Sequence, residues 1–137
     1  MLRRYNNGLV SGAPISISGV SIARDALINS SQFQETHRTF LTGGSAGAIV
    51  TVTLTSLAKS TGIGTFYCDA FPGGFMNQGD SFTYTLSSSG TGAFVVIIDS
   101  GDVGGDNTVT ATLTITAISA GVVGNPSSQS YSHTTHV

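Results

Sequence analysis

The sequence has few charged residues and no long apolar run, and each shortage excludes a class of partner. Charged side chains make up 9% of its 137 residues, whereas an average soluble domain has about 25%. Five basic residues, of which only Arg3 and Arg4 are adjacent, are too few to neutralise a nucleic-acid backbone. No apolar stretch approaches the ~20 residues that cross a bilayer. We therefore expect no nucleic-acid partner and no membrane partner.

Cysteine is nearly absent as well. Cys68 stands alone, so no disulfide forms within the chain, and a small secreted disulfide scaffold is disfavoured. The first residues, "MLRRYNNGLVSG", place no apolar run behind their arginines and make a poor signal peptide. A chain of this length hides roughly two-thirds of its unfolded surface and needs no metal to fold. We expect a protein made in the cytoplasm of its host and without cofactors.

Strict alternation of apolar and polar residues dominates what is present. In "NTVTATLTITAIS", residues 107–119, valine, alanine, leucine and isoleucine fall on one face and threonine on the other. The stretch "AIVTVTLTSL", residues 48–57, repeats the pattern. A period of two with β-branched residues predicts strands with one buried face. The unbroken apolar run "GAFVVIID", residues 92–99, predicts a strand covered on both faces.

Gly- and Ser-rich turns separate these stretches at intervals typical of an antiparallel β-sandwich. Further strands are expected over 33–41, 64–71 and 81–87, and a short helix over 24–33, where Asp25 could cap it. The fold class is therefore all-β, a single antiparallel β-sandwich or jelly-roll-like domain over residues 14–119. Residues 1–13 and 120–137 lack a strand pattern and are expected to be extended N- and C-terminal arms.

The uncharged "TVTLT" and "TVTATLTIT" segments raise a question about sheet edges. Exposed edge strands are normally protected by lysine, proline or charge. This chain has one lysine and three prolines. It must therefore bury these strands in a sheet centre or cover them with a partner, and the net charge of -2 offers little repulsion against association.

One glycine-rich loop, "IIDSGDVGGDN", holds three of the seven acidic residues: Asp99, Asp102 and Asp106. Three carboxylates could supply half of a calcium shell, but the spacing of an EF-hand and any repeat are missing. Asp and Gly are also the residues of turns. We predict a hairpin turn between two strands rather than a metal site, and keep these aspartates as a weak calcium alternative.

No constellation of residues identifies an active site. Cys68 and His37 are the one pair that resembles a nucleophile and its base, and nothing but residue type joins them. Cys68 alternates with apolar neighbours, which predicts a small core residue. His133 and His136 would align for a metal only on a helix, which the local residues disfavour. We expect no catalytic residues and no enzyme.

The loop "DAFPGGFMNQGD", residues 69–80, is the most distinctive candidate for contact with another protein. Its aromatic and methionine side chains either form an exposed apolar tip or close the end of the core. Together with aromatic and basic residues of the arms, they make up the candidate interface, which comprises Arg3, Arg4, Tyr5, Phe71, Phe75, Met76 and Tyr131.

Low charge, unprotected strands and unstructured-looking ends favour a subunit that sits among neighbours. The first hypothesis is a structural, non-enzymatic subunit of a symmetric assembly, namely a virion, as a capsid, capsid-decorating or surface-projection protein. Its partners would be further copies of itself, as a homo-oligomer, or other capsid proteins. The virion is an analogy with small Thr/Gly/Ser-rich β-sandwich proteins. The alternative is an extracellular adhesion or carbohydrate-binding module, stabilised by calcium.

Overall fold

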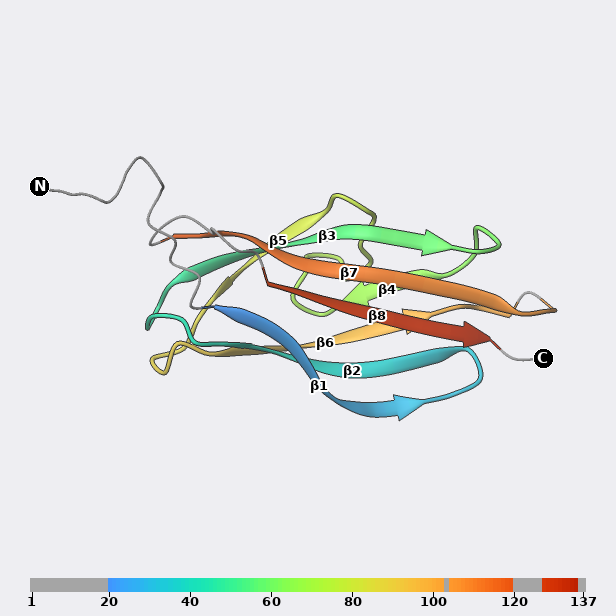
Figure 1. The fold of residues 1–137 in the computed structure, drawn as a ribbon, viewed down its shortest axis with the longest axis horizontal. Helices are drawn as coiled ribbons and strands as arrows, with labels where there is room; N and C mark the ends of the chain where they lie inside the picture. The colour runs from blue at the N-terminus through green and yellow to red at the C-terminus, as the bar shows by residue number, and fades with distance from the viewer. Residues whose placement is uncertain (1–19, 103, 120–126, 136–137) are drawn as a thin grey trace, which may run out of the picture.

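The computed structural model describes residues 20–102, 104–119 and 127–135, which form eight strands and no helix. The strands pack as two four-stranded antiparallel sheets, ordered β1-β2-β6-β4 and β5-β3-β7-β8 (Figure 1). An all-β antiparallel sandwich, as predicted, is confirmed. The strands are β1 (Ser21–Ser30), β2 (Gln34–Thr42), β3 (Ile49–Lys59), β4 (Thr65–Cys68), β5 (Ser81–Thr85), β6 (Gly92–Asp99), β7 (Asn107–Ile118) and β8 (Ser128–Thr135).

The two threonine-rich segments are the central strands β3 and β7 of the second sheet. Their apolar residues point inward, so that Val50 and Val52 of β3 and Val109 and Leu113 of β7 are fully buried. Their threonines lie on the other face, as the alternation predicts. The sequence thus protects these uncharged strands by placing them between β5 and β8, not by leaving them at an edge.

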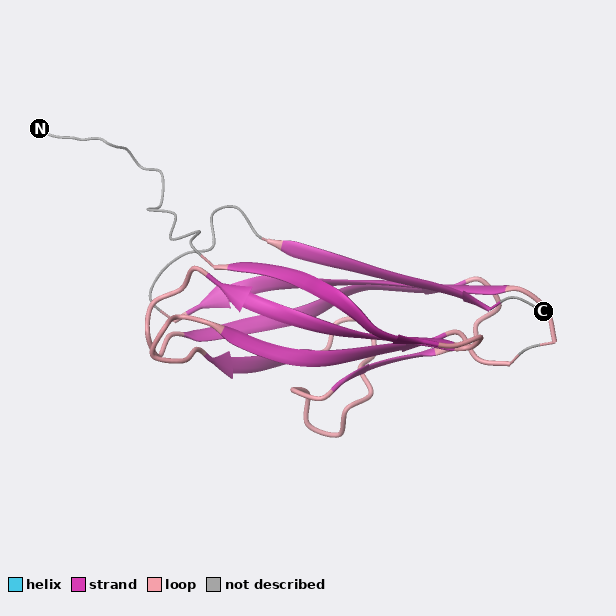
Figure 2. Ribbon diagram, turned by 90° about the horizontal axis from the view of Figure 1, so that it is seen from below, coloured by secondary structure: helices cyan, strands magenta, loops and turns pink. Residues whose placement is uncertain are grey.

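The first sheet supplies the opposite wall of the core. Phe94, Val96 and Ile98 point inward from β6, and Phe66 and Cys68 from β4. Cys68 is fully buried, which confirms its predicted place in the core. The long strands of both sheets run along the same axis of the molecule (Figure 2), as in aligned sandwiches.

The edge strands β4 and β1 are partly protected by other segments of the described chain. The free edge of β4 pairs with a loop segment, since the Cys68 amide donates to the Gly74 carbonyl and the Met76 amide to Phe66, both at 2.9 Å. The outer amides of β1 donate to side chains at the start of β8: Ile22 N to Ser127 Oγ at 3.0 Å, and Arg24 N to Gln129 Oε1 at 3.2 Å. The case for a partner therefore has to rest on other surfaces.

Two sequence predictions require correction. The segment predicted as a short helix begins within β1, because pairing with β2 outweighs a weak local preference. The register between them shifts after Arg24 and again after Leu27. The expected C-terminal arm contains β8, which pairs with β7 along its whole length. The expected N-terminal arm, 1–13, and residues 120–126 lie outside the described residues.

Candidate interaction surface

The outer face of the sheet β5-β3-β7-β8 is covered by hydroxyl groups, and we call it the hydroxyl face. Neighbouring strands join their side chains in cross-strand pairs. Thr55 and Thr114 are 2.9 Å apart between their oxygens, and Thr112 and Ser130 are 3.2 Å apart. Paired hydroxyls satisfy one another and leave few donors for a ligand. This surface is uncharged and mostly polar, with Ile49 at the start of β3, 45% exposed, as a large apolar exception.

The outer face of the sheet β1-β2-β6-β4 has the opposite character. Its centre consists of Phe40 on β2, Val95 and Ile97 on β6, and Tyr67 on β4, all half-buried, and of Phe75, which is 62% exposed. Tyr67 and Phe75 meet edge to face with ring centres 5.3 Å apart. We call these five residues the apolar face. Phe75 is the exposed member of this group, and apolar surface of this kind is typical of sites of protein association.

The loop 69–80 contributes to both the core and the apolar face. Met76 is buried and Phe71 packs half-buried against the core, so these two close the end of the sandwich. Phe75 alone points outward, held beside Tyr67 by a β-bridge between the two residues. Of the two alternatives that the sequence leaves open for this loop, each therefore describes part of it.

Tyr131, another interface candidate, is a core residue: it is 1% exposed and its hydroxyl lies 2.6 Å from that of Thr39. Burial raises the pKa of its phenol above the usual value, although the bond to Thr39 opposes the shift. Burial also raises the pKa of the Cys68 thiol to about 12. A thiol held protonated at neutral pH is a poor nucleophile, and no hydrogen bond joins it to His37 within the described chain.

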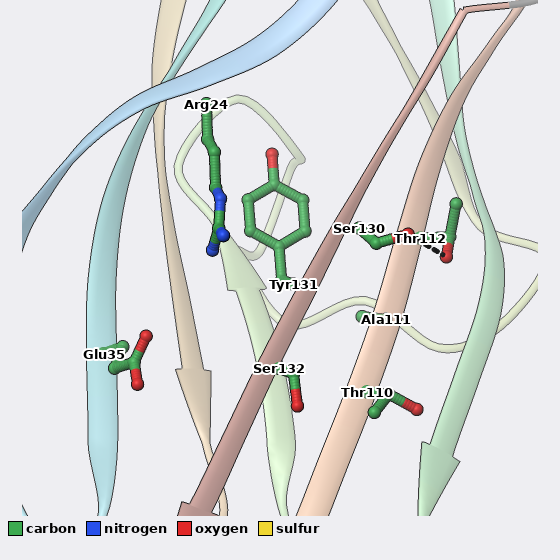
Figure 3. Close-up of a pocket in the computed structure, with 8 residues that line it drawn as sticks. All are labelled: Arg24, Glu35, Thr110, Ala111, Thr112, Ser130, Tyr131 and Ser132. Atoms are coloured by element: carbon green, nitrogen blue, oxygen red, sulfur yellow. Dashed lines mark hydrogen bonds between the residues drawn. The ribbon is translucent and has the colours of Figure 1, made fainter.

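A shallow groove of about 520 Å³ lies where β1 and β8 flank the opening between the sheets. Figure 3 shows the Arg24 side chain alongside the Tyr131 ring, with Glu35 farther along the opening. One oxygen of the Glu35 carboxylate, Oε1, lies 3.0 Å from His37 Nε2. The remaining lining comes from Thr110, Ala111, Thr112, Ser130 and Ser132.

The core also holds a serine–histidine pair, Ser100 and His133, that the sequence does not predict. Ser100 Oγ lies 2.7 Å from His133 Nδ1 and donates to the Phe33 carbonyl at 3.2 Å, while His133 Nε2 lies 3.1 Å from the Ser31 carbonyl oxygen. Glu35 lies 4.0 Å from the same Nε2. Ser100 is fully buried, and its hydroxyl also meets Thr135. A substrate could reach this hydroxyl only if the sandwich opened, so the pair ties the two sheets together.

The acidic loop connects β6 to β7, which lie in different sheets, so the predicted hairpin is wrong while the prediction of a connecting turn holds. Asp99 Oδ1 accepts from the Gly101 amide at 2.7 Å, and Asp102 Oδ1 accepts from the Gly104 amide at 3.3 Å. Within the described residues, no three His, Cys, Asp or Glu side chains lie close enough together to hold a metal ion. This includes the third aspartate of the loop, Asp106.

The basic and aromatic candidates Arg3, Arg4 and Tyr5 lie outside the described residues, as does His136. In the part of the chain that the structure describes, no helix has the length and apolar character to cross a membrane. Compared with models of known protein families, the chain matches none, and no curated protein sequence matches it.

Proposed function

We propose that this protein is a structural, non-enzymatic subunit of a symmetric assembly, and that the assembly is a virion. The observation that carries the proposal is the apolar face. Phe75 is 62% exposed there, beside Tyr67 and the outward residues of β6. In an isolated chain this apolar surface is exposed to water, which is unfavourable in free energy. Burial of the surface against a partner would remove that cost.

The sequence of β6 supports the same conclusion. Val95 and Ile97 alternate with the buried Phe94, Val96 and Ile98, so this strand is apolar on both faces. Strands of that composition are typical of sheets that are covered on both sides. In the part of the chain that the structure describes, the inner face of β6 is buried and the outward Val95 and Ile97 are half-buried, so a partner could cover them further.

The low charge of the chain fits close association. With 9% charged residues and a net charge of -2, neighbouring copies meet little repulsion. The virion rests on analogy: small β-sandwich chains rich in Thr, Gly and Ser are common among capsid, capsid-decorating and surface-projection proteins. In this proposal the partners are further copies of the chain or other capsid proteins.

The solution mass, measured by light scattering at micromolar concentrations with and without calcium, tests the proposal. We expect an oligomer of fixed size that does not depend on calcium, and closed rings or shells by electron microscopy. Val95→Thr with Ile97→Thr should weaken the association, because the exchange makes the apolar face polar at similar volume. Thr112→Val on the hydroxyl face is the matched control. A wild-type chain that stays monomeric throughout would overturn the proposal.

A further inference from the structure

Three residues on the outer surface of the first sheet lie in one row across the strands. Arg38 on β2 is the register partner of Val95 on β6. On the other side of β6, Asp69 continues β4 by one residue: its amide donates to the Val95 carbonyl at 3.1 Å, and its carboxylate accepts from the Val95 amide at 3.0 Å. The row therefore reads arginine, valine, aspartate.

The two charged residues of this row, Arg38 and Asp69, are both exposed. The ion pairs within the described residues all involve Glu35, which lies on the inner side of the sheet. Among the side chains that the structure describes, which do not include that of Asp25, neither Arg38 nor Asp69 forms an ion pair. Arg38 and Asp69 both border the apolar face, so a partner that docks there would remove water from the two charged groups. An unpaired charge buried in that way is costly, so a partner must supply the opposite charge.

The spacing of strands places the two charges symmetrically. Neighbouring strands lie ~4.8 Å apart, so Arg38 and Asp69 stand at about equal distances on either side of β6. The next row has the same form: Thr36 on β2 pairs with Ile97, and Ile97 pairs with Tyr67 on β4. A hydroxyl residue therefore lies on each side of the second apolar residue.

A second copy of the same face complements this pattern under one particular two-fold axis. An axis that runs along β6, in the plane of the contact, exchanges the two sides of the strand. It places Arg38 of each copy over Asp69 of the other, and Thr36 over Tyr67. An axis across the strands would instead place Arg38 over Arg38. Under the first axis Val95 and Ile97 pack against their own counterparts.

We infer that the apolar face docks against the same face of a second copy across a two-fold axis along β6, with two reciprocal ion pairs between Arg38 and Asp69. This inference rests on the proposed function, since it names the partner that covers the apolar face. The slight rotation between packed sheets, ~30°, is accommodated by the long arginine side chain.

Charge exchange tests the axis directly. Arg38→Asp sets aspartate against Asp69 in both reciprocal pairs, and Asp69→Arg sets arginine against Arg38. Each variant alone should associate roughly 100-fold or more weakly than wild type. An equimolar mixture of the two variants should recover association as a mixed dimer, because both of its pairs are again of opposite sign. Lys59→Glu on β3 changes the net charge as much as Arg38→Asp does and should leave association unchanged.

A second measurement does not depend on reversing Asp69, whose carboxylate also holds the Val95 amide. Val95→Cys places a thiol on the proposed axis, opposite its own copy, and should form an intermolecular disulfide under mild oxidation. Thr112→Cys on the hydroxyl face is the control and should stay unlinked.

The outcomes separate this inference from the proposed function. A wild-type chain that associates, with charge variants that associate equally well, overturns the axis and leaves the assembly proposal standing. Charge variants that dissociate but do not recover on mixing show that the two residues meet different partners, which also overturns the axis. A wild-type chain that never associates overturns both.

Discussion

The hydrogen bond between Tyr131 and Thr39 joins the two sheets deep in the core, and removing it tests the placement of Tyr131. The two hydroxyl oxygens are 2.6 Å apart, and both residues are at most 1% exposed. Tyr131→Phe keeps the ring, which packs against Phe66 and His37, and removes only the hydroxyl. Thr39 is then left with a buried, unpaired hydroxyl, which costs about 1–3 kcal/mol of unfolding free energy.

A double-mutant cycle isolates the bond. Thr39→Val alone leaves the Tyr131 hydroxyl unpaired and should cost a similar amount. The double variant removes both hydroxyls and should cost clearly less than the sum, because two apolar groups of the same shape replace the pair. Urea unfolding of all four chains measures the coupling, which we expect at about 1–2 kcal/mol. Additive effects, with no coupling, would refute the buried hydrogen bond between Tyr131 and Thr39.

Three further predictions concern other parts of the sandwich. The pKa of the Cys68 thiol is raised from 9.0 to about 12, so the thiol should resist alkylation until the chain unfolds. As the pH rises from 9 to 12, the free energy of unfolding should fall by up to ~1.4 kcal/mol per pH unit, because the thiol ionises in the unfolded chain before it does in the folded one. Gly90→Ala should destabilise more than Gly47→Ala in thermal unfolding, because both residues have a positive φ but only a Cβ at Gly90 runs into backbone, at Gly44. Asn107→Ala, which removes four hydrogen bonds to neighbouring loops, should cost roughly 2–4 kcal/mol by urea unfolding.

The sequence predicts the strands best where alternation is strict. The threonine-rich stretches became β3 and β7 with the expected inward residues, because a period of two with β-branched side chains admits few other structures. Cys68 was found in the core on the same grounds. These are local patterns, and they do not depend on which strand lies beside which.

The predictions that are wrong concern polar strands and the sheet to which each strand belongs. The β8 segment "SQSYSHTT" alternates as well, but its inward residues include His133 and Thr135, which a hydropathy pattern places in solvent. Their burial depends on partners from distant segments: Ser100 contacts both side chains, His133 also meets the Ser31 carbonyl, and Thr135 donates to the Gly101 carbonyl. The mistaken hairpin at 97–107 has a related cause, since nothing local says that β6 and β7 belong to different sheets.

The two outer faces of the sandwich, rather than its edges, bear on whether the chain has a partner. A chain that covers one sheet with paired hydroxyls on β3 and β7 can evidently build a water-facing surface. On the other sheet, the same positions of β6 carry Val95 and Ile97, with Phe75 exposed nearby. The internal packing does not require this difference, because outward side chains do not touch the core. The interface that we propose on that face would account for its apolar residues, whereas edge pairing would not.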